Sequence, residues 1–221
     1  MRAELPAAGH PSMPPYDHLT DELLALGTSI LCESSGLPGA LDHTIRPVWH
    51  GAAVTGPAFP LRCAAGDNLA IHVAVDQTPP GHILVVDGMG VIAGYWGEIL
   101  TVAAQARDIT GLVIDGGVRD VAAIERRKFP VFARGIGMRA CVKLHAPSVG
   151  EPVVVGGVLV APGDLIVADA DGVACIPQAQ VERTLAAARQ RTEKEAGIIA
   201  RLEKGETTVD ILGLAAHRKK Q

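Results

Sequence analysis

The fold is decided by a stretch of the chain that reads GLVIDGGVRDVAAIERRKFPVFARG, residues 111–135. It begins with an apolar run typical of a buried strand, continues with the apolar spacing of a helix, and ends in a second strand-like run. A strand, a helix and a strand in this order predict one unit of a parallel sheet. Gly116 and Gly117 are expected to let the backbone turn tightly after the first strand, so that Arg119 points inward.

The same alternation precedes this stretch. Residues 51–59 and 82–87 have the composition of strands, and helices are predicted to start at Asp67 or Asn68 and after Gly97. Alternating strands and helices with short connections favour a parallel layer that helices cover. The sequence therefore predicts the α/β fold class.

The pattern then changes. Runs 152–160 and 164–177 each place β-branched residues on both sides of a turn, at Gly156–Gly157 in the first and at Asp169–Gly172 in the second. Such runs predict two β-hairpins, which would add antiparallel strands to the parallel layer.

The chain ends in a long, charged helical pattern that starts at Gln178. One small domain cannot bury a helix of this length, so we expect it to pack on a neighbouring subunit. Near the other end of the chain, Thr20 is expected to cap a helix. We divide the chain into an N-terminal arm (1–18), an α/β domain (19–177) and a C-terminal helix with its tail (178–221).

The composition suits one compact domain and argues against several classes of protein. The chain has 221 residues, of which 48% are hydrophobic but only 3% aromatic, so its core must be built from Ala, Val, Ile and Leu. A net charge of −4 indicates no nucleic-acid partner, and no apolar run approaches the ~20 residues that span a membrane. Four cysteines without CxxC spacing, and an N-terminus without an apolar signal stretch, predict a reducing, cytoplasmic setting.

The helix after Gly97 is the first candidate for a binding site. Its opening N–H groups, at Ile99 and Leu100, can hold a carboxylate or a phosphate. The alternative is an acidic first turn in which Glu98 only complements the helix dipole. No phosphate-loop or dinucleotide-binding glycine pattern accompanies this helix.

The dipeptide Arg119–Asp120 is the second candidate, because it follows the end of a predicted strand, as the helix with Glu98 also does. Carboxylates beside one arginine suit a hard divalent cation and an anionic, oxygen-rich substrate. The alternative is that Asp120 caps the next helix and Arg119 is its solvated neighbour. The histidines lack HExxH spacing and the serines lack a GxSxG elbow, which argues against a zinc site and a serine hydrolase.

These segments carry a resemblance to a known family. Residues 97–120, GEILTVAAQARDITGLVIDGGVRD, together with GDNLAIHVA, PGDLIVADADGVACIP and RTEKEA, resemble the RraA-like family. That family contains class II aldolases for 4-hydroxy-4-methyl-2-oxoglutarate and 4-carboxy-4-hydroxy-2-oxoadipate, and also the regulator of ribonuclease E activity. In the aldolases an acidic residue, often aspartate, stands twenty intervening residues before Arg-Asp. Glu98 keeps that spacing from Arg119–Asp120 here, as a glutamate.

The resemblance implies a metal site shared between two subunits. Asp120 would bind Mg²⁺ or Mn²⁺, while Glu98 and the Glu195 of a neighbouring subunit would complete the metal shell through water. It also implies an α/β/β/α sandwich of the phosphohistidine-swivelling type, assembled as a homotrimer or a hexamer.

The substrate site is implied in the same way. Arg119 and Glu98 would be the catalytic residues, with Arg119 against the keto or enolate oxygen of a small 2-oxo acid. Gly97, Ile99 and Leu100 would bind the substrate carboxylate at the helix start. Since no motif places a histidine there, a water on the metal is the expected general base.

The implied reaction releases pyruvate and a second 2-oxo acid, with oxaloacetate decarboxylation as a side activity. Two alternatives remain open at this point. The chain could be a non-catalytic regulator of the ribonuclease E type, or a family enzyme that acts on another hydroxy or sugar acid.

Overall fold

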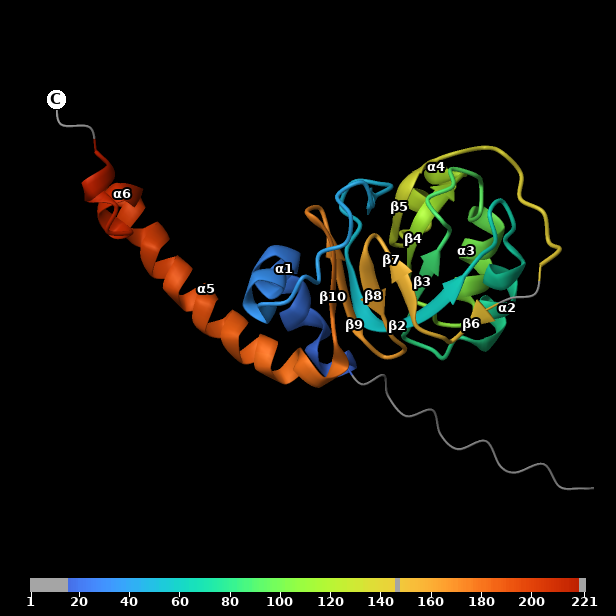
Figure 1. Cartoon of the computed structure of the whole chain (residues 1–221), viewed down its shortest axis with the longest axis horizontal. Helices are drawn as coiled ribbons and strands as arrows, with labels where there is room; N and C mark the ends of the chain where they lie inside the picture. The colour runs from blue at the N-terminus through green and yellow to red at the C-terminus, as the bar shows by residue number, and fades with distance from the viewer. Residues whose placement is uncertain (1–15, 146–147, 219–221) are drawn as a thin grey trace, which may run out of the picture.

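The computed structural model of the chain describes residues 16–145 and 148–218 (Figure 1). Most of the arm predicted at residues 1–18 lies outside the described residues. Within the two described ranges, no helix combines the length and the apolar character that a membrane crossing requires.

The centre of the fold is a mixed sheet of eight strands, in the order β1–β5–β4–β3–β2–β9–β10 with β6 beside β2. Neighbouring strands from β2 to β5 are parallel, and the other pairs are antiparallel. A separate hairpin is formed by β7 and β8. The strand bounds are β1 (Arg46–Pro47), β2 (Val54–Arg62), β3 (Ile83–Asp87), β4 (Gly111–Val118), β5 (Val131–Ile136), β6 (Ser148–Val149), β7 (Val153–Val155), β8 (Val158–Val160), β9 (Leu165–Asp169) and β10 (Gly172–Ile176).

Helices join the parallel strands, as predicted. The helix bounds are α1 (Thr20–Ser35), α2 (Leu69–Gln77), α3 (Glu98–Gln105), α4 (Val121–Arg126), α5 (Val181–Glu203) and α6 (Thr208–Ile211), with short 3-10 turns at Asp17–Leu19, Gln178–Gln180 and Ala215–His217. The order β2–α2–β3–α3–β4–α4–β5 confirms the predicted parallel layer, and both predicted hairpins are present.

The core is divided among both faces of the sheet, because strand side chains alternate between them. Helices α2 to α4 cover one face, where Leu112 and Ile114 of β4 join a cluster around Trp96. On the opposite face, Val113 joins a second cluster that includes the β7–β8 hairpin. Helices α1 and α5 enclose a third cluster against β9 and β10, to which Leu31 contributes (Figure 1). Both faces of the curled sheet are therefore packed against hydrophobic clusters.

The ends of the sheet approach one another, so the sheet is nearly closed. Arg46 in β1 donates a hydrogen bond from Nη1 to the carbonyl of Asp171, just before β10, at 2.7 Å. The α/β class is confirmed, as is the long C-terminal helix. The four-layer sandwich of the phosphohistidine-swivelling type stays a prediction, since the hydrogen bonds define one curled sheet and a small hairpin.

Three local predictions were wrong. No glycine turn follows β4, because the strand continues to Val118 with a register shift between Ile114 and Gly117. Gly117 is needed for space instead, since a side chain there would meet the backbone of Ala93. The side chain of Thr20 makes no cap bond at the start of α1. Strand β2 lies three residues later than the predicted 51–59: it continues through Pro60, whose carbonyl accepts a hydrogen bond from the N–H of Gly150 (2.9 Å).

Helix α5 leaves the body of the domain after its first turns. Val181, Leu185 and Ala188 are buried, whereas most residues beyond Ala188 are half-buried or exposed. Figure 1 shows the far half of α5 and α6 extending away from the sheet. The predicted helix is thus present, and its far half has little contact with the rest of its own chain.

Candidate functional site

A small cavity of about 120 Å³ opens beside the start of α3, where the chain leaves β4. Its lining combines two cationic side chains, one carboxylate and the first residues of a helix. The lining residues are Asn68, His72, Gly94, Tyr95, Gly97, Ile99, Leu100, Arg119, Asp120 and Lys143. Five of the predicted site residues are among them: Gly97, Ile99, Leu100, Arg119 and Asp120.

The Arg119–Asp120 dipeptide reaches this cavity because β4 is followed directly by a contact with the segment before α3. The N–H of Arg119 donates to the carbonyl of Trp96 at 2.8 Å, and Trp96 is bridged to Val118 as a short parallel extension. Trp96 itself is fully buried and stacks on Phe129. The large aromatic side chain therefore fixes the backbone that places both the dipeptide and the start of α3.

Asp120 caps α3 and not the helix that follows it in sequence. It occupies the N-cap position of α4 but makes no side-chain bond there. Instead, Oδ2 of Asp120 accepts a hydrogen bond from the backbone N–H of Glu98 at 3.0 Å. The backbone of Asp120 is left-handed, with φ 58° and ψ 34°, a strained conformation that aspartate tolerates better than most residues. This strained backbone conformation places the carboxylate of Asp120 against the first N–H group of α3.

Gly97 leaves the space into which that carboxylate fits. Its φ of −164° is extended backbone, which other residues adopt as easily. A Cβ at this position, however, would collide with the carboxylate of Asp120 and lie 3.2 Å from Cγ of Arg119. Glycine is therefore required here for close approach.

The start of α3 presents N–H groups toward a charged pocket. Ile99 and Leu100 are in its first turn, where backbone N–H groups have no partner within the helix and carry the positive end of the helix dipole. Arg119 lies on the same cavity, with Nε 3.9 Å from Oδ2 of Asp120. This arrangement can hold a small carboxylate with an adjacent oxygen.

The side chain of Glu98 is placed elsewhere. Its Oε1 accepts hydrogen bonds from Nη2 (2.9 Å) and Nε (3.1 Å) of Arg127, at the end of α4. Gln105 donates to the carbonyl of Arg127 at 3.0 Å, so the same pair of helices is joined twice. Glu98 is not among the residues that line the cavity. The structure thus brings its backbone, but not its carboxylate, to the site.

Glu195 lies in the part of α5 beyond Ala188, which leaves the body of the domain, and its side chain is partly exposed. Its Oε1 accepts a hydrogen bond from Nε of Arg191 at 2.9 Å, and Arg191 is also paired with Glu33 of α1. Across the described ranges there is no group of three or more His, Cys, Asp or Glu side chains arranged to hold a metal. Within those ranges, Asp120 and Glu195 of the same chain do not belong to one such cluster.

Five lining residues were not predicted from the sequence, among them Asn68, His72 and Lys143. Asn68 is buried; its Nδ2 donates to the carbonyl of Tyr95 at 2.9 Å, and its Oδ1 has no partner among the described residues. Burial, followed by the charge of Lys143, lowers the pKa of His72. Asn68 and His72 are four residues apart on one helix face, a signal that was readable; nothing in the sequence marked Lys143.

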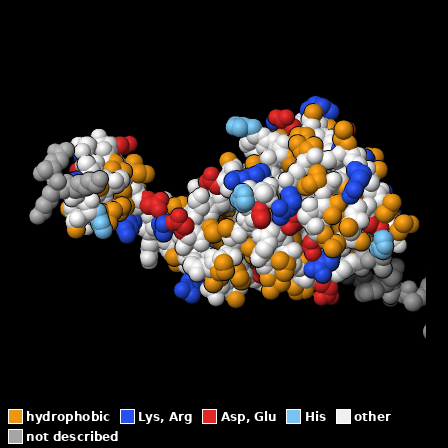
Figure 2. Space-filling view, turned by 45° about the horizontal axis from the view of Figure 1, so that its top comes forward, with side chains coloured by type: hydrophobic (Ala, Val, Ile, Leu, Met, Phe, Trp, Pro, Cys, Tyr) orange, Lys and Arg blue, Asp and Glu red, His pale blue; other side chains and the backbone are white. Residues whose placement is uncertain are grey.

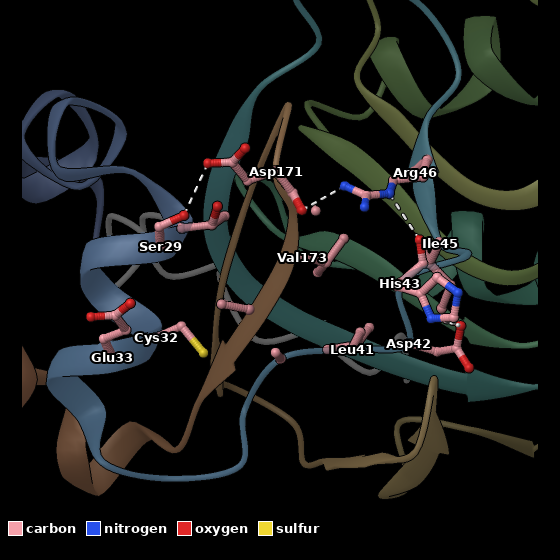
Figure 3. Close-up of a pocket in the computed structure, with 14 residues that line it drawn as sticks. Ser29, Cys32, Glu33, Leu41, Asp42, His43, Ile45, Arg46, Asp171 and Val173 are labelled. Carbon is pink, nitrogen blue, oxygen red and sulfur yellow. Dashed lines mark hydrogen bonds and ion pairs between the residues drawn. The ribbon is translucent and has the colours of Figure 1, made fainter. Parts of the chain in front are cut away.

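A second hollow, of about 310 Å³, lies between α1, β10 and the loop before β1 (Figure 3). Several of its polar side chains already have hydrogen-bond partners. Ser29 donates to Asp171 at 2.9 Å, and Arg46 donates to the carbonyls of His43 and Asp171. The cavity at α3 is the better candidate, because it has free helix N–H groups and an unpartnered buried oxygen.

The comparisons with known proteins identify the family. The sequence profile of the RraA-like family, described as Aldolase/RraA, matches residues 19–175. The chain belongs to the RraA-like family. A protein of Halalkalibacterium halodurans that carries the provisional name 4-hydroxy-4-methyl-2-oxoglutarate aldolase is 38% identical over 72% of this chain and 78% of its own length.

Solved structures with the same fold include RraA-like proteins. An uncharacterized protein from Pseudomonas syringae pv. tomato matches with a TM-score of 0.76 and 30% identity, over 89% of this chain and 97% of its own. RraAS2 of Streptomyces coelicolor, described as an unusual member of the RNase ES inhibitor RraA protein family, matches with a TM-score of 0.73 and 25% identity, over 84% and 98%. The family thus includes relatives named for an aldolase and relatives named for ribonuclease inhibition.

Proposed function

We propose that the chain is a metal-dependent aldolase. Its substrate is 4-hydroxy-4-methyl-2-oxoglutarate or 4-carboxy-4-hydroxy-2-oxoadipate, which it cleaves to pyruvate and a second 2-oxo acid. The observation that carries the proposal is the convergence of Arg119, Asp120 and the start of α3 on one cavity. The name of the Halalkalibacterium relative supports the same reaction.

The residues at the cavity suit Mg²⁺ or Mn²⁺. Asp120 offers a carboxylate and Asn68 an unpartnered amide oxygen, and no thiol lines the cavity. Mg²⁺ prefers oxygen ligands and is commonly held by one or two carboxylates together with substrate and water. Asp120 would hold the ion, and the bound ion would supply Lewis-acid polarisation of the 2-keto oxygen. Glu98 keeps its family position but would have to leave Arg127 to contact the water shell.

The protein groups would then divide the reaction among them. The N–H groups of Ile99 and Leu100 bind the C1 carboxylate, which orients the 2-oxo acid. A base takes the proton from the 4-hydroxyl, C4 becomes the carbonyl of the second 2-oxo acid, and the C3–C4 bond breaks. Its electron pair forms the C2=C3 bond and the carbonyl pair moves to the 2-oxygen, which gives the pyruvate enolate. Arg119 stabilises the charge on that oxygen. Protonation of C3 then gives pyruvate. A neutral His72 or a water molecule can act as the base in the first step.

A shared active site follows if Glu195 reaches the cavity of a neighbouring subunit. Its helix extends away from its own domain, and exposed apolar residues lie near the end of α5 (Ile199) and directly after α6 (Leu212 and Leu214). In Figure 2 hydrophobic side chains gather around the end of this helical arm, and hydrophobic and charged side chains are interspersed over the visible body. Burial of such an arm against another copy would form the homotrimer or hexamer.

The decisive experiment replaces Arg119 and measures pyruvate release. Arg119→Ala should lower kcat by roughly 10²–10³-fold, the scale for one preorganised donor to a developing charge. Arg119→Lys should recover only part of the rate, because an ammonium does not reproduce the planar guanidinium. A folded Arg119→Ala protein with the wild-type kcat would remove this arginine from the mechanism.

A second candidate function is inhibition of a ribonuclease, favoured by the match to the Streptomyces RraAS2 structure. The two candidates separate in one pair of assays. The aldolase predicts pyruvate release from 4-carboxy-4-hydroxy-2-oxoadipate with Mg²⁺, together with slow decarboxylation of oxaloacetate through the same enolate. The regulator predicts neither activity, but inhibition of RNA cleavage by a ribonuclease of the E type.

A further inference from the structure

A single buried carboxylate joins two segments that border the cavity. Asp67 is only 2% exposed. Its Oδ1 accepts a hydrogen bond from the N–H of Leu69, at the start of α2 (2.8 Å). Its Oδ2 accepts three hydrogen bonds, from the N–H groups of Leu144 (2.7 Å) and His145 (2.9 Å) and from Nδ1 of His145 (2.9 Å).

The two carboxylate oxygens of Asp67 bind different segments of the chain. A helix cap needs only the bond to Leu69, which satisfies one of the free N–H groups at the start of α2. All three bonds to the other oxygen come from residues 144–145, far away in sequence. Burial alone would raise the pKa of Asp67, but its hydrogen bonds hold that pKa well below the usual range. The ionised carboxylate of Asp67 is therefore the form that joins the start of α2 to residues 144–145.

Lys143 directly precedes the two residues that Asp67 binds. Before it, Val142 exchanges backbone hydrogen bonds with the turn at 66–68: its N–H donates to Gly66 (2.9 Å) and its carbonyl accepts from Asn68 (3.0 Å). After it come the two N–H groups held by Asp67. Lys143 lines the cavity with Asn68 and His72, and its charge contributes to the lowered pKa of His72. The backbone of Lys143 is thus held on both sides while the residue lines the cavity.

We infer that Asp67 is a positioning residue for the cavity: it fixes residues 142–145 so that the ammonium of Lys143 meets the carboxylates of the bound 2-oxo acid. This inference rests on the proposed function. Lys143 is exposed, and a long side chain on a loose segment would lose conformational freedom on binding. A segment that is already fixed loses less, so the same contact contributes more to affinity.

The test is a double-mutant cycle on the intact oligomer with Mg²⁺. Asp67→Asn offers one acceptor oxygen in place of two, so it cannot hold α2 and residues 144–145 together. We expect it to raise the KM for the 2-oxo acid and the Kd for pyruvate about tenfold, the scale of one charged hydrogen bond, with kcat changed much less. In a Lys143→Met background, Asp67→Asn should cause no further rise.

The matched control is Asp76→Asn, at the far end of the same helix, where the carboxylate is exposed and paired with Arg107. It should leave KM at the wild-type value. If Asp67→Asn does not fold, His145→Ala removes one of the three donors from the protein surface, and its smaller rise in KM should also vanish in the Lys143→Met background. Independent effects of Asp67 and Lys143 on KM would overturn the inference, because they would show that Asp67 does not act through Lys143.

Amide hydrogen exchange gives a readout that does not depend on the reaction. The N–H groups of Leu144 and His145 should exchange faster in Asp67→Asn than in the wild type and in Asp76→Asn. Unchanged exchange at both amides would also overturn the inference. A wild-type chain that neither binds pyruvate nor cleaves 2-oxo acids would sink the proposed function instead, and the exchange rates would still decide whether Asp67 fixes the segment.

Discussion

Replacement of Gly97 by alanine adds one methyl group at the point where the site has no room for it. The new Cβ would occupy the space of the Asp120 carboxylate and lie 3.2 Å from Cγ of Arg119. The backbone at position 97 is extended and accepts alanine without strain. Any loss of activity in Gly97→Ala would therefore come from displacement of Asp120 and Arg119.

The size of the effect follows from that displacement. To make room, the carboxylate must leave the N–H of Glu98, from which it now accepts a hydrogen bond of 3.0 Å. Overpacking costs about 1–3 kcal/mol, and a hydrogen bond to a charged group contributes about 1.5–3 kcal/mol. Both figures describe one movement and are not added. We expect a loss of about 2 kcal/mol, which corresponds to roughly a 30-fold lower kcat/KM.

The assay is pyruvate release from 4-hydroxy-4-methyl-2-oxoglutarate, with the melting temperature and the affinity for Mn²⁺ as parallel measurements. Gly197→Ala in α5 is the matched control for stability, because no atom lies within 4 Å of a Cβ built there. It should raise the free energy of unfolding by up to about 1 kcal/mol, the usual gain for alanine inside a helix. A Gly97→Ala protein with the wild-type kcat/KM would refute the reasoning, since the carboxylate would then have no required place.

Three other predictions concern the metal, pH and assembly. Removal of divalent ions with EDTA should abolish pyruvate release and added Mg²⁺ should restore it, because the proposed ligands are oxygens; full turnover in the chelated sample would exclude the metal role. Burial and Lys143 lower the pKa of His72 below its ordinary value of 6.5, so the unfolded chain takes up a proton more readily than the folded one. The contribution of His72 to the free energy of unfolding is therefore fully present above pH 6.5 and declines as pH falls. By calorimetry, His72→Gln should show a smaller drop in melting temperature between pH 7 and 5 than the wild type. Light scattering should give a trimer or a multiple of it, and Glu195→Ala should weaken Mn²⁺ binding in that assembly; a fully active monomer would contradict both.

Much of the fold could be predicted from the sequence because its signals are local. The apolar runs of β3 and β4 and the glycine pairs of the hairpins fix strands and turns within a few residues. The glycines after Asp115 were misread for a physical reason. Gly117 is a glycine because the backbone of Ala93 lies against it, and a contact between separate segments leaves no local mark.

The site was predictable only in part, for the same reason. Glu98 and Arg119–Asp120 both follow predicted strands of one parallel layer, which indicated convergence, and the backbone bond from Glu98 to Asp120 joins these segments. The pairing of Glu98 with Arg127 depends on how α3 and α4 lie side by side, which no spacing in the sequence specifies. Lys143 belongs to a segment that is bonded to Asp67 and to the turn at 66–68, more than seventy residues away in the sequence.

The left-handed backbone at Asp120 bears on how such a site can change over evolution. Glu98 stands on regular helix, with a partly exposed side chain, so its length can vary by a methylene without altering the main chain. Asp120 has no such freedom: its φ of 58° favours aspartate, asparagine or glycine, and among these only aspartate carries a charge. Divergence should therefore begin at the first acidic position and spare the second, and a lineage that loses Asp120 should pass to asparagine or glycine and give up the negative charge in the same step.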